Sequence, residues 1–177
     1  MHLLNTSSTW PPTLTFRHIC FIAKVSSIKK VDLDEKGAPH KFWYKKQIEI
    51  INKLYLNENV EHQDLIVREI SNKQKGYQKQ DVEKKILNKD KLINYDQIIE
   101  LLVVKKLKCY YCDGNCSLLY KKVLERKQWT LDRINNDLGH NYDNIVLCCL
   151  DCNIKRGNMN SERFKSGKTI KIVKKEF

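Results

Sequence analysis

The chain has 177 residues, which is enough for one globular domain with a buried core or for a small module with an appendage. Its 33 Lys and Arg against 21 Asp and Glu give a formal charge of +12. That excess suits a polyanionic partner such as nucleic acid, although a Lys-, Asn- and Ile-rich codon usage would also produce it. No apolar stretch approaches the roughly 20 residues of a membrane-spanning helix, so neither a membrane span nor a signal peptide is predicted.

The N-terminal part of the chain divides into two regions. Residues 1–40 hold Ser-, Thr- and Pro-containing stretches without a helical period, and we expect a poorly ordered or linker-like segment there. Residues 41–104 are expected to form a helical region, whose role the sequence does not indicate. Apolar residues at steps of three and four predict amphipathic helices over 42–57 and 62–75, with Gly76 as a stop.

A third helix is predicted in "NYDQIIELLVVKKLK", which has Asn94 or Asp96 as its N-cap and lysines at its end. This helix leads the chain directly to Cys109.

The C-terminal part is predicted to contain a ββα unit. "WTLDRI" and "NIVLCC" predict two short strands, joined by a polar stretch rich in turn formers. "LDCNIKRGNMNSERF" predicts a short helix ending near Gly157 and a helical turn after Asn160. We place this module at residues 105–164 and a basic tail at 165–177, in which "TIKIV" could add a strand. The predicted fold is therefore α+β, an N-terminal α-helical region followed by a ββα module.

The cysteine spacing indicates a structural metal site. Four of the seven cysteines form two Cys-x-x-Cys pairs, Cys109 with Cys112 and Cys149 with Cys152. This spacing lets two thiolates from one tight turn reach one ion, so the pairs predict a four-cysteine Zn2+ site in a reducing, intracellular compartment. Cys116 and Cys148 could replace a ligand, although Cys148 is expected to point into the core. Cys20 is most simply a free cysteine.

The stretches "KCYYC" and "LDRINNDLGHNYDNIVLCCLDCNIKRG" together resemble the HNH endonucleases, the His-Asn-His or ββα-metal nuclease superfamily, of the zinc-stapled kind. The Asp-Arg-Ile, Asp-Asn and Cys-x-x-Cys-Asn-x-x-Arg elements follow the family's order and approximate spacing over about residues 105–160. The resemblance implies a metal-dependent endonuclease that hydrolyses phosphodiester bonds of double-stranded DNA. In it one divalent metal, usually Mg2+, acts as a Lewis acid at the scissile phosphate.

Three residues take family roles through this resemblance. Asp132 and Asn153 match positions that hold the catalytic divalent metal, and hard oxygen ligands suit Mg2+. Asn144 matches the middle Asn, which typically pins the loop through backbone hydrogen bonds and orients the base. Two simpler interpretations stay open. Asp132 could form an ion pair with Arg133 or Arg156, and Asn153 could only cap a helix end.

The chain departs from the family pattern at the general base. Arg133 stands where the fuller motif has His, and an arginine cannot accept a proton at neutral pH, although it can clamp a phosphate oxygen. His140, in the loop between the strands, is the obvious replacement, because its pKa suits proton abstraction. The alternatives are Asp143, a metal-bound hydroxide without a protein base, and a site that binds without cutting.

Basic residues around the motif predict contacts with nucleic acid. Lys155 and Arg156 follow Asn153 on the helix and can meet phosphates, while Trp129 is expected in the core. A basic track would be extended by Lys121, Lys122, Arg126 and Lys127. A noncatalytic zinc module that binds nucleic acid is the alternative function, and a protein-interaction module is a third. The Lys/Asn/Ile-rich usage fits an AT-rich genome, such as that of a large DNA virus, phage or mobile element.

Overall fold

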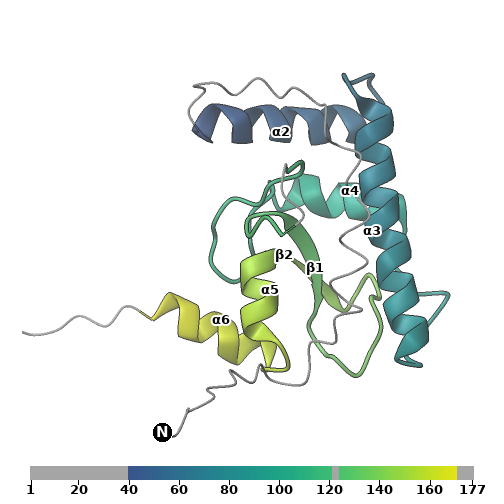
Figure 1. Ribbon diagram of the computed structural model, residues 1–177, viewed down its shortest axis with the longest axis vertical. Coiled ribbons are helices and arrows are strands. Elements are labelled where there is room, and N and C mark those ends of the chain that lie inside the picture. Colours follow the sequence, from purple (N-terminus) through teal and green to yellow (C-terminus); the bar gives the residue numbers. More distant parts are fainter. Residues whose placement is uncertain (1–39, 121–123, 171–177) are drawn as a thin grey trace, which may run out of the picture.

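The computed structural model describes residues 40–120 and 124–170, with side chains from residue 44 onward (Figure 1). Within these residues it contains five helices and a two-stranded antiparallel sheet, so the predicted α+β arrangement is confirmed. The elements in chain order are α2 (His40–Tyr55), α3 (Gln63–Glu83), α4 (Tyr95–Val104), β1 (Trp129–Arg133), β2 (Ile145–Cys149), α5 (Leu150–Arg156) and α6 (Ser161–Thr169). The expected N-terminal linker with Cys20, the pair Lys121 and Lys122, and most of the basic tail lie outside the described residues.

The helix α4 begins as its sequence predicts, and Asn94 is its cap. The Asn94 side chain accepts a hydrogen bond from the backbone N–H of Gln97 at 2.9 Å, and the Gln97 side chain accepts one from the backbone N–H of Asn94 at 3.0 Å. This reciprocal capping box satisfies two N–H groups that the first turn leaves without partners. The buried face of α4 consists of Ile98, Ile99 and Leu102.

The second predicted helix is wrong at its C-terminal end. Gly76 does not stop α3, which continues to Glu83, and Gly76 is buried inside it. In the extension, Tyr77 and Asp81 reach the ββα unit, as Lys73 does one turn before Tyr77. Their partners are distant in the sequence, so tertiary contacts offset the poor helix propensity of glycine.

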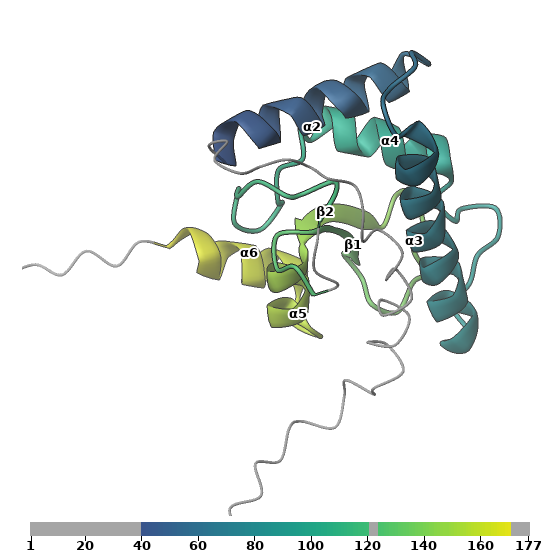
Figure 2. The ribbon, with the colours of Figure 1, turned by 45° about the horizontal axis from the view of Figure 1, so that its top comes forward.

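The hairpin pairs Trp129 with Cys149 and Arg133 with Ile145 at its two ends, and all ten strand residues are buried. The helix α5 packs against both strands, while α3 hydrogen-bonds to backbone groups at the outer edge of β1. Figures 1 and 2 show the strands between these two helices, with α2 and α4 lying beside one another across one end.

The core joins the helical region to the hairpin. Its largest fully buried side chains include Ile51 of α2, Ile66 and Ile70 of α3, Leu102 of α4 and Trp129 of β1. Trp129 is fully buried, as expected, and the Lys73 ammonium lies 4.6 Å from its ring centroid. In the part of the chain that the structure describes, none of the helices is long and apolar enough to cross a membrane.

Candidate functional site

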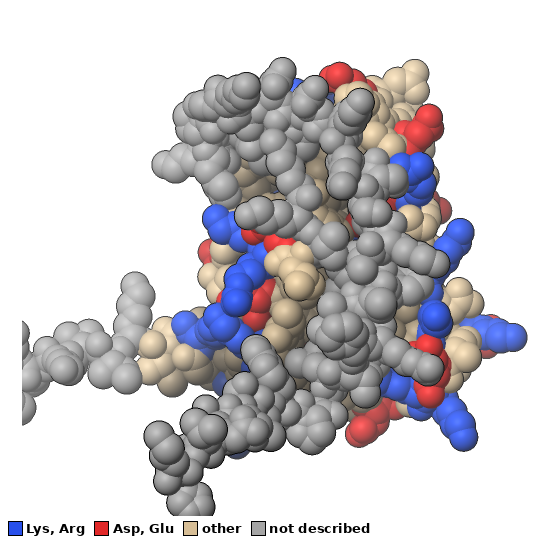
Figure 3. Space-filling model, in the orientation of Figure 1, with Lys and Arg blue, Asp and Glu red and all other residues tan. Residues whose placement is uncertain are grey.

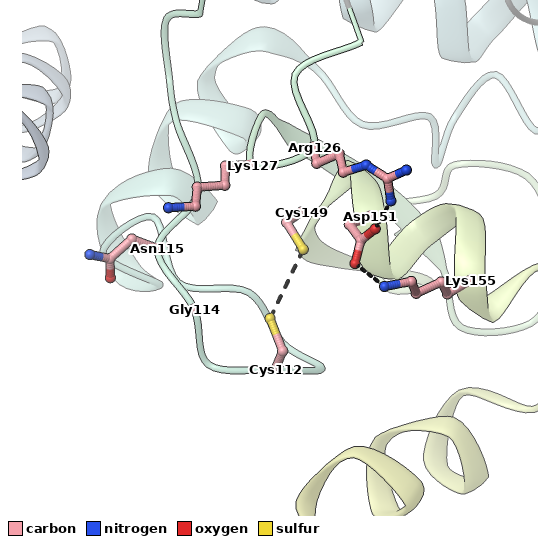
Figure 4. Close-up of a pocket in the computed structure, with 8 residues that line it drawn as sticks. All are labelled: Cys112, Gly114, Asn115, Arg126, Lys127, Cys149, Asp151 and Lys155. Atoms are coloured by element: carbon pink, nitrogen blue, oxygen red, sulfur yellow. Dashed lines mark hydrogen bonds and ion pairs between the residues drawn. The ribbon is translucent and has the colours of Figure 1, made fainter. Parts of the chain in front are cut away.

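The four predicted zinc ligands come together. The sulfur atoms of Cys109, Cys112, Cys149 and Cys152 all lie within 4.8 Å of one another. The Cys112 and Cys149 sulfurs are 4.0 Å apart (Figure 4). A tetrahedral Zn2+ with bonds of about 2.3 Å places its sulfurs about 3.8 Å apart, so the cluster fits a metal ion such as zinc.

Local backbone structure presents each pair of thiols. The first pair lies on a tight turn, in which Cys109 donates its backbone N–H to Gly114 and accepts one from Asp113, both at 2.9 Å. A Cβ at Gly114 would lie 3.2 Å from the Cys112 sulfur, so a small residue suits this turn. The second pair joins β2 to α5, because Cys149 ends the strand and is the N-cap of the helix. The cluster therefore ties the turn after α4 to the junction of the hairpin and α5.

Metal binding would require these thiols to lose their protons. Burial raises the pKa of the Cys152 thiol to about 12. The Cys149 thiol has a raised pKa as well, first because of its hydrogen bond to Cys109 and then because of burial. Such thiols do not ionise together without a positive ion, and a bound metal supplies that charge when it displaces their protons.

The two alternative cysteines are not among the four clustered sulfurs. Cys148 is fully buried beside the Thr130 hydroxyl, at 3.2 Å, which agrees with its expected place in the core. Cys116 is also buried and interacts with the Cys109 thiol.

Asp132 lies on the side of β1 that faces α5 and forms a buried ion pair. Its Oδ1 accepts a hydrogen bond from Arg156 at 2.8 Å, and its Oδ2 accepts one from the Tyr111 hydroxyl at 2.7 Å. Burial raises the pKa of Asp132, although both of these hydrogen bonds act in the opposite direction. Of the two ion pairs left open by the sequence, the structure contains the one with Arg156.

Asn153 lies inside α5 and faces the same side of β1. Its Nδ2 donates to the Thr130 hydroxyl at 3.0 Å, and Thr130 in turn donates to the Cys148 carbonyl at 3.2 Å. Because the amide nitrogen faces Thr130, the amide oxygen points elsewhere, and it has no hydrogen-bond partner among the described residues. Cys149, not Asn153, is the N-cap of this helix.

Asn144 fixes the loop between the strands. Its Oδ1 accepts from the Asn135 N–H at 2.9 Å, and its Nδ2 donates to the carbonyls of Asn135 and Gly139 at 2.9 and 3.0 Å. Arg133 closes the same loop by donating to the carbonyls of Asn136 and Leu138. Burial lowers the pKa of the Arg133 guanidinium, and Asp81 and Asp132 oppose this effect.

His140 is not placed with Asp132 and Asn153. Asp132 contacts Arg156 of α5, whereas His140 contacts α3. The His140 ring stacks on Tyr77 of α3 with centroids 4.6 Å apart. It is 3% exposed, and its Nδ1 lies 2.7 Å from Asp81 Oδ1. The alternative base, Asp143, is exposed and pairs with Lys91 at 3.0 Å.

The predicted basic contacts differ in their exposure. Lys155 and Arg126 are solvent-exposed, and each pairs with Asp151 at 2.6 Å on one side of a pocket that Cys112 and Cys149 also line (Figure 4). Lys127 lines the same pocket. On the face shown in Figure 3, Lys and Arg gather near α5 and α6, with acidic side chains between them.

Arg156, in contrast, is only 3% exposed, which differs from the expected phosphate contact. Its guanidinium donates to five oxygen atoms: Asp132 Oδ1, Asn136 Oδ1 and the carbonyls of Arg133, Ile134 and Met159.

Four residues that support this site did not stand out in the sequence. Thr130 and Tyr111 contact the expected metal ligands, while Tyr77 contacts the edge of β1 and Asp81 contacts the loop between the strands. The four-residue spacing from Lys73 through Tyr77 to Asp81 was the available signal for α3. Tyr111 carried no signal apart from its place between two cysteines.

Comparison with known proteins adds one partial similarity. An uncharacterized protein of Acanthamoeba polyphaga mimivirus is 41% identical to the chain over 56 residues. That segment makes up 32% of this chain and 9% of the viral protein, so the chain spans only a small part of that relative. No protein-family profile matches the chain, and no solved structure matches it.

Proposed function

We propose that the chain is a metal-dependent endonuclease that hydrolyses phosphodiester bonds of DNA on a zinc-stabilised ββα unit. The observation that carries this proposal is the placement of Asp132 on β1 and Asn153 on α5, both on the side of the hairpin where strand and helix pack together. The four-cysteine cluster braces the start of the same helix. The resemblance of this segment to HNH endonucleases assigns these two residues to the catalytic metal.

The two side chains retain oxygen lone pairs suited to a hard divalent cation. A carboxylate offers about four lone-pair positions, and Asp132 uses two of them for Arg156 and Tyr111. The Asn153 amide oxygen is turned away from Thr130. Mg2+ bound by these oxygens would supply a Lewis acid for the phosphate.

The neighbours of Asp132 supply positive charge and orientation but no general base. Arg156 and Tyr111 do not accept a proton at neutral pH, and burial raises the pKa of Tyr111 further. Because His140 is held by Asp81 and Tyr77 of α3, no side chain beside Asp132 is available to abstract a proton from water. Arg133 and Asn144 hold the adjacent loop in shape.

Charge supports nucleic acid as the partner, and the resemblance to HNH endonucleases suggests double-stranded DNA. The formal charge of +12 favours a polyanion, and the exposed side chains of Arg126 and Lys155 are placed to contact phosphates beside the site. Reduced cysteines at zinc spacing support an intracellular setting. The partial similarity to a mimivirus protein supports a viral origin.

Nicking of supercoiled plasmid in Mg2+ or Mn2+ tests the activity. We expect the zinc-loaded protein to nick, and Asn153→Ala to reduce the rate by roughly two orders of magnitude, the scale on which one contact to developing charge acts. Asn72→Ala, at an exposed position of α3, is the matched control and should retain full activity. Equal nicking by Asn153→Ala and the wild type would remove Asn153 from the site.

A second candidate is a noncatalytic module that binds nucleic acid. The buried Asp132–Arg156 ion pair favours it, because the guanidinium already neutralises the carboxylate that the metal would need. Under this alternative the protein binds duplex DNA with a strong dependence on salt but does not nick it in any divalent metal. That combination would exclude the endonuclease.

A further inference from the structure

The loop between β1 and β2 meets α3 at one buried point. Asp81 of α3 receives the backbone N–H of His140 on Oδ2 at 2.6 Å, and its Oδ1 lies 2.7 Å from His140 Nδ1. The two side chains are 1% and 4% exposed. A single carboxylate therefore holds both the main chain and the ring of one loop residue.

Gly139, the residue before His140, leaves room for the contact between Asp81 and the loop. A Cβ on Gly139 would lie 2.8 Å from Asp81 Oδ2 and 2.8 Å from the carbonyl oxygen of Ile86. Both distances are shorter than van der Waals contact, so a larger residue would displace either the carboxylate or the backbone after α3. Glycine here allows the close approach of helix and loop.

Three further contacts hold Gly139 and His140 in place. The His140 ring stacks on Tyr77, and its carbonyl accepts a hydrogen bond from the Ile93 N–H at 3.0 Å. On the other side, Asn144 donates to the Gly139 carbonyl. The loop that Asn144 closes is therefore held between the hairpin and the helical region.

We propose that Asp81 is a positioning residue that sets the conformation of the β1–β2 loop, with His140 as the side chain through which the loop docks on α3. The segment 63–83 thus belongs functionally to the ββα unit, although it lies outside the motif. Asp81 accepts from the loop, so the imidazole carries its proton on Nδ1 and leaves Nε2 unprotonated. Any effect of Asp81 on nicking rests on the proposed endonuclease, whereas its effect on the loop does not.

Asp81→Asn in the full-length, zinc-loaded protein tests this role. We expect the Nδ1-protonated tautomer of His140 to lose population, as read from imidazole 15N chemical shifts assigned with His140→Gln. Amide hydrogen exchange in residues 134–144 should accelerate by roughly tenfold or more, as expected when a hydrogen bond to a charged group is lost. Zinc content and the exchange of β1 and β2 should stay unchanged, which separates a loop effect from general unfolding.

Asp64→Asn, at an exposed position in the first turn of α3, is the matched control and should leave both measurements as in the wild type. Unchanged tautomer and unchanged loop exchange in Asp81→Asn would overturn the proposal. If Asp81→Asn loses zinc or helix content, the Gly139→Ala variant tests the same contact between α3 and the loop. It should speed exchange in the loop while keeping zinc, and wild-type exchange there would equally overturn the proposal.

The kinetics of plasmid nicking test separately whether the loop conformation affects activity. Asp81→Asn should lower kcat and leave KM for plasmid unchanged, because the loop is displaced while the exposed basic residues are intact. If the wild type does not nick, the endonuclease fails, yet the tautomer and exchange measurements still decide the role of Asp81.

Discussion

Arg156 shows how one buried charge can organise a site. Its guanidinium joins the end of β1, the loop after it and the segment after α5 through five hydrogen bonds, and it neutralises Asp132. Lys155, its neighbour on α5, is exposed and pairs with Asp151 at the surface. Two adjacent basic residues therefore differ, since Arg156 is buried in a network and Lys155 lies at the surface. A count of charges in the sequence does not reveal this difference.

Arg156→Ala should destabilise the zinc-loaded protein by about 3–5 kcal/mol, because it leaves the Asp132 carboxylate buried without its cation. Urea denaturation at constant zinc measures the change. Lys155→Ala is the control and should cost less than about 1 kcal/mol, as expected for a surface pair. A loss below about 1 kcal/mol for Arg156→Ala would show that water replaces the guanidinium readily.

His140 should make stability depend on pH. Burial lowers its pKa in the folded protein, Arg133 and Lys84 add to this effect, and Asp81 opposes it. The unfolded chain, with a His pKa of about 6.5, therefore takes up a proton that the folded protein does not. The stability associated with the neutral ring is fully present above about pH 6.5 and is lost as the pH falls below that value.

Denaturation of the wild type and of His140→Gln between about pH 7.5 and 5.5, with saturating zinc, measures this effect across the ordinary His pKa. The wild type should lose more stability than the variant over this interval. Release of zinc by cysteine protonation affects both proteins alike, so the difference between them isolates His140. Parallel pH profiles would contradict the expectation.

At the scale of elements, α3 connects the helical region to the hairpin through three polar side chains. Lys73 donates to the Trp129 carbonyl at 2.5 Å, and the Tyr77 hydroxyl accepts from the Leu131 N–H at 3.0 Å. Asp81 binds the loop one turn further along. Burial also lowers the pKa of Lys73 to about 8, against the effect of Glu69. The helix thus provides one polar contact per turn.

Tyr77→Phe should lower the free energy of unfolding by about 1–3 kcal/mol, because it leaves the buried Leu131 N–H without its acceptor. Tyr55→Phe, at an exposed position at the end of α2, is the matched control and should change stability little. Thermal or urea denaturation distinguishes the two. Equal stability of Tyr77→Phe and wild type would mean that another acceptor satisfies Leu131.

Local patterns in the sequence predicted most of the elements. The hairpin, α5 and the Asn94 cap were recognisable because short-range signals determine them: apolar strands, turn formers and a capping residue. The C-terminal half of α3 was not recognisable, because its buried side chains are those of Tyr77 and Asp81. Burial of such side chains depends on partners more than 50 residues away.

The same distinction holds for the site. Cysteine spacing is local, so all four clustered cysteines were predicted. His140 contacts Asp81, which is 59 residues distant, and no local pattern in the sequence indicates that contact. The Asp132–Arg156 pair was one of two ion pairs that the sequence left open.

At the scale of the whole molecule, the cysteine cluster connects two segments that are distant in the sequence. It fastens the turn after α4 to the start of α5, with β1 and β2 between the two pairs in sequence. The buried apolar core spans both regions. The metal should therefore stabilise the hairpin and α5 more than α2 and α4.

Chelation of the metal should unfold the ββα unit first. We expect one zinc per chain by elemental analysis, and Cys152→Ser should reduce that content. After chelation, amide protection should be lost in β1, β2 and α5 before it is lost in α2 and α4. Cys148→Ser, at a buried cysteine outside the cluster, is the control and should keep its zinc. Full zinc content in Cys152→Ser would argue against the four-cysteine ligand set.

The contacts around the hairpin also bear on self-association. Lys73, Tyr77 and the Ser117 carbonyl engage outward backbone groups of β1, and the Tyr110 N–H donates to the Leu147 carbonyl of β2 at 2.8 Å. A strand with unpaired backbone groups can add a strand from another molecule. A fragment that begins after α3 would expose the Trp129 carbonyl and the Leu131 N–H. By occupying these groups, α3 should keep the edge of β1 from pairing with a strand of another molecule.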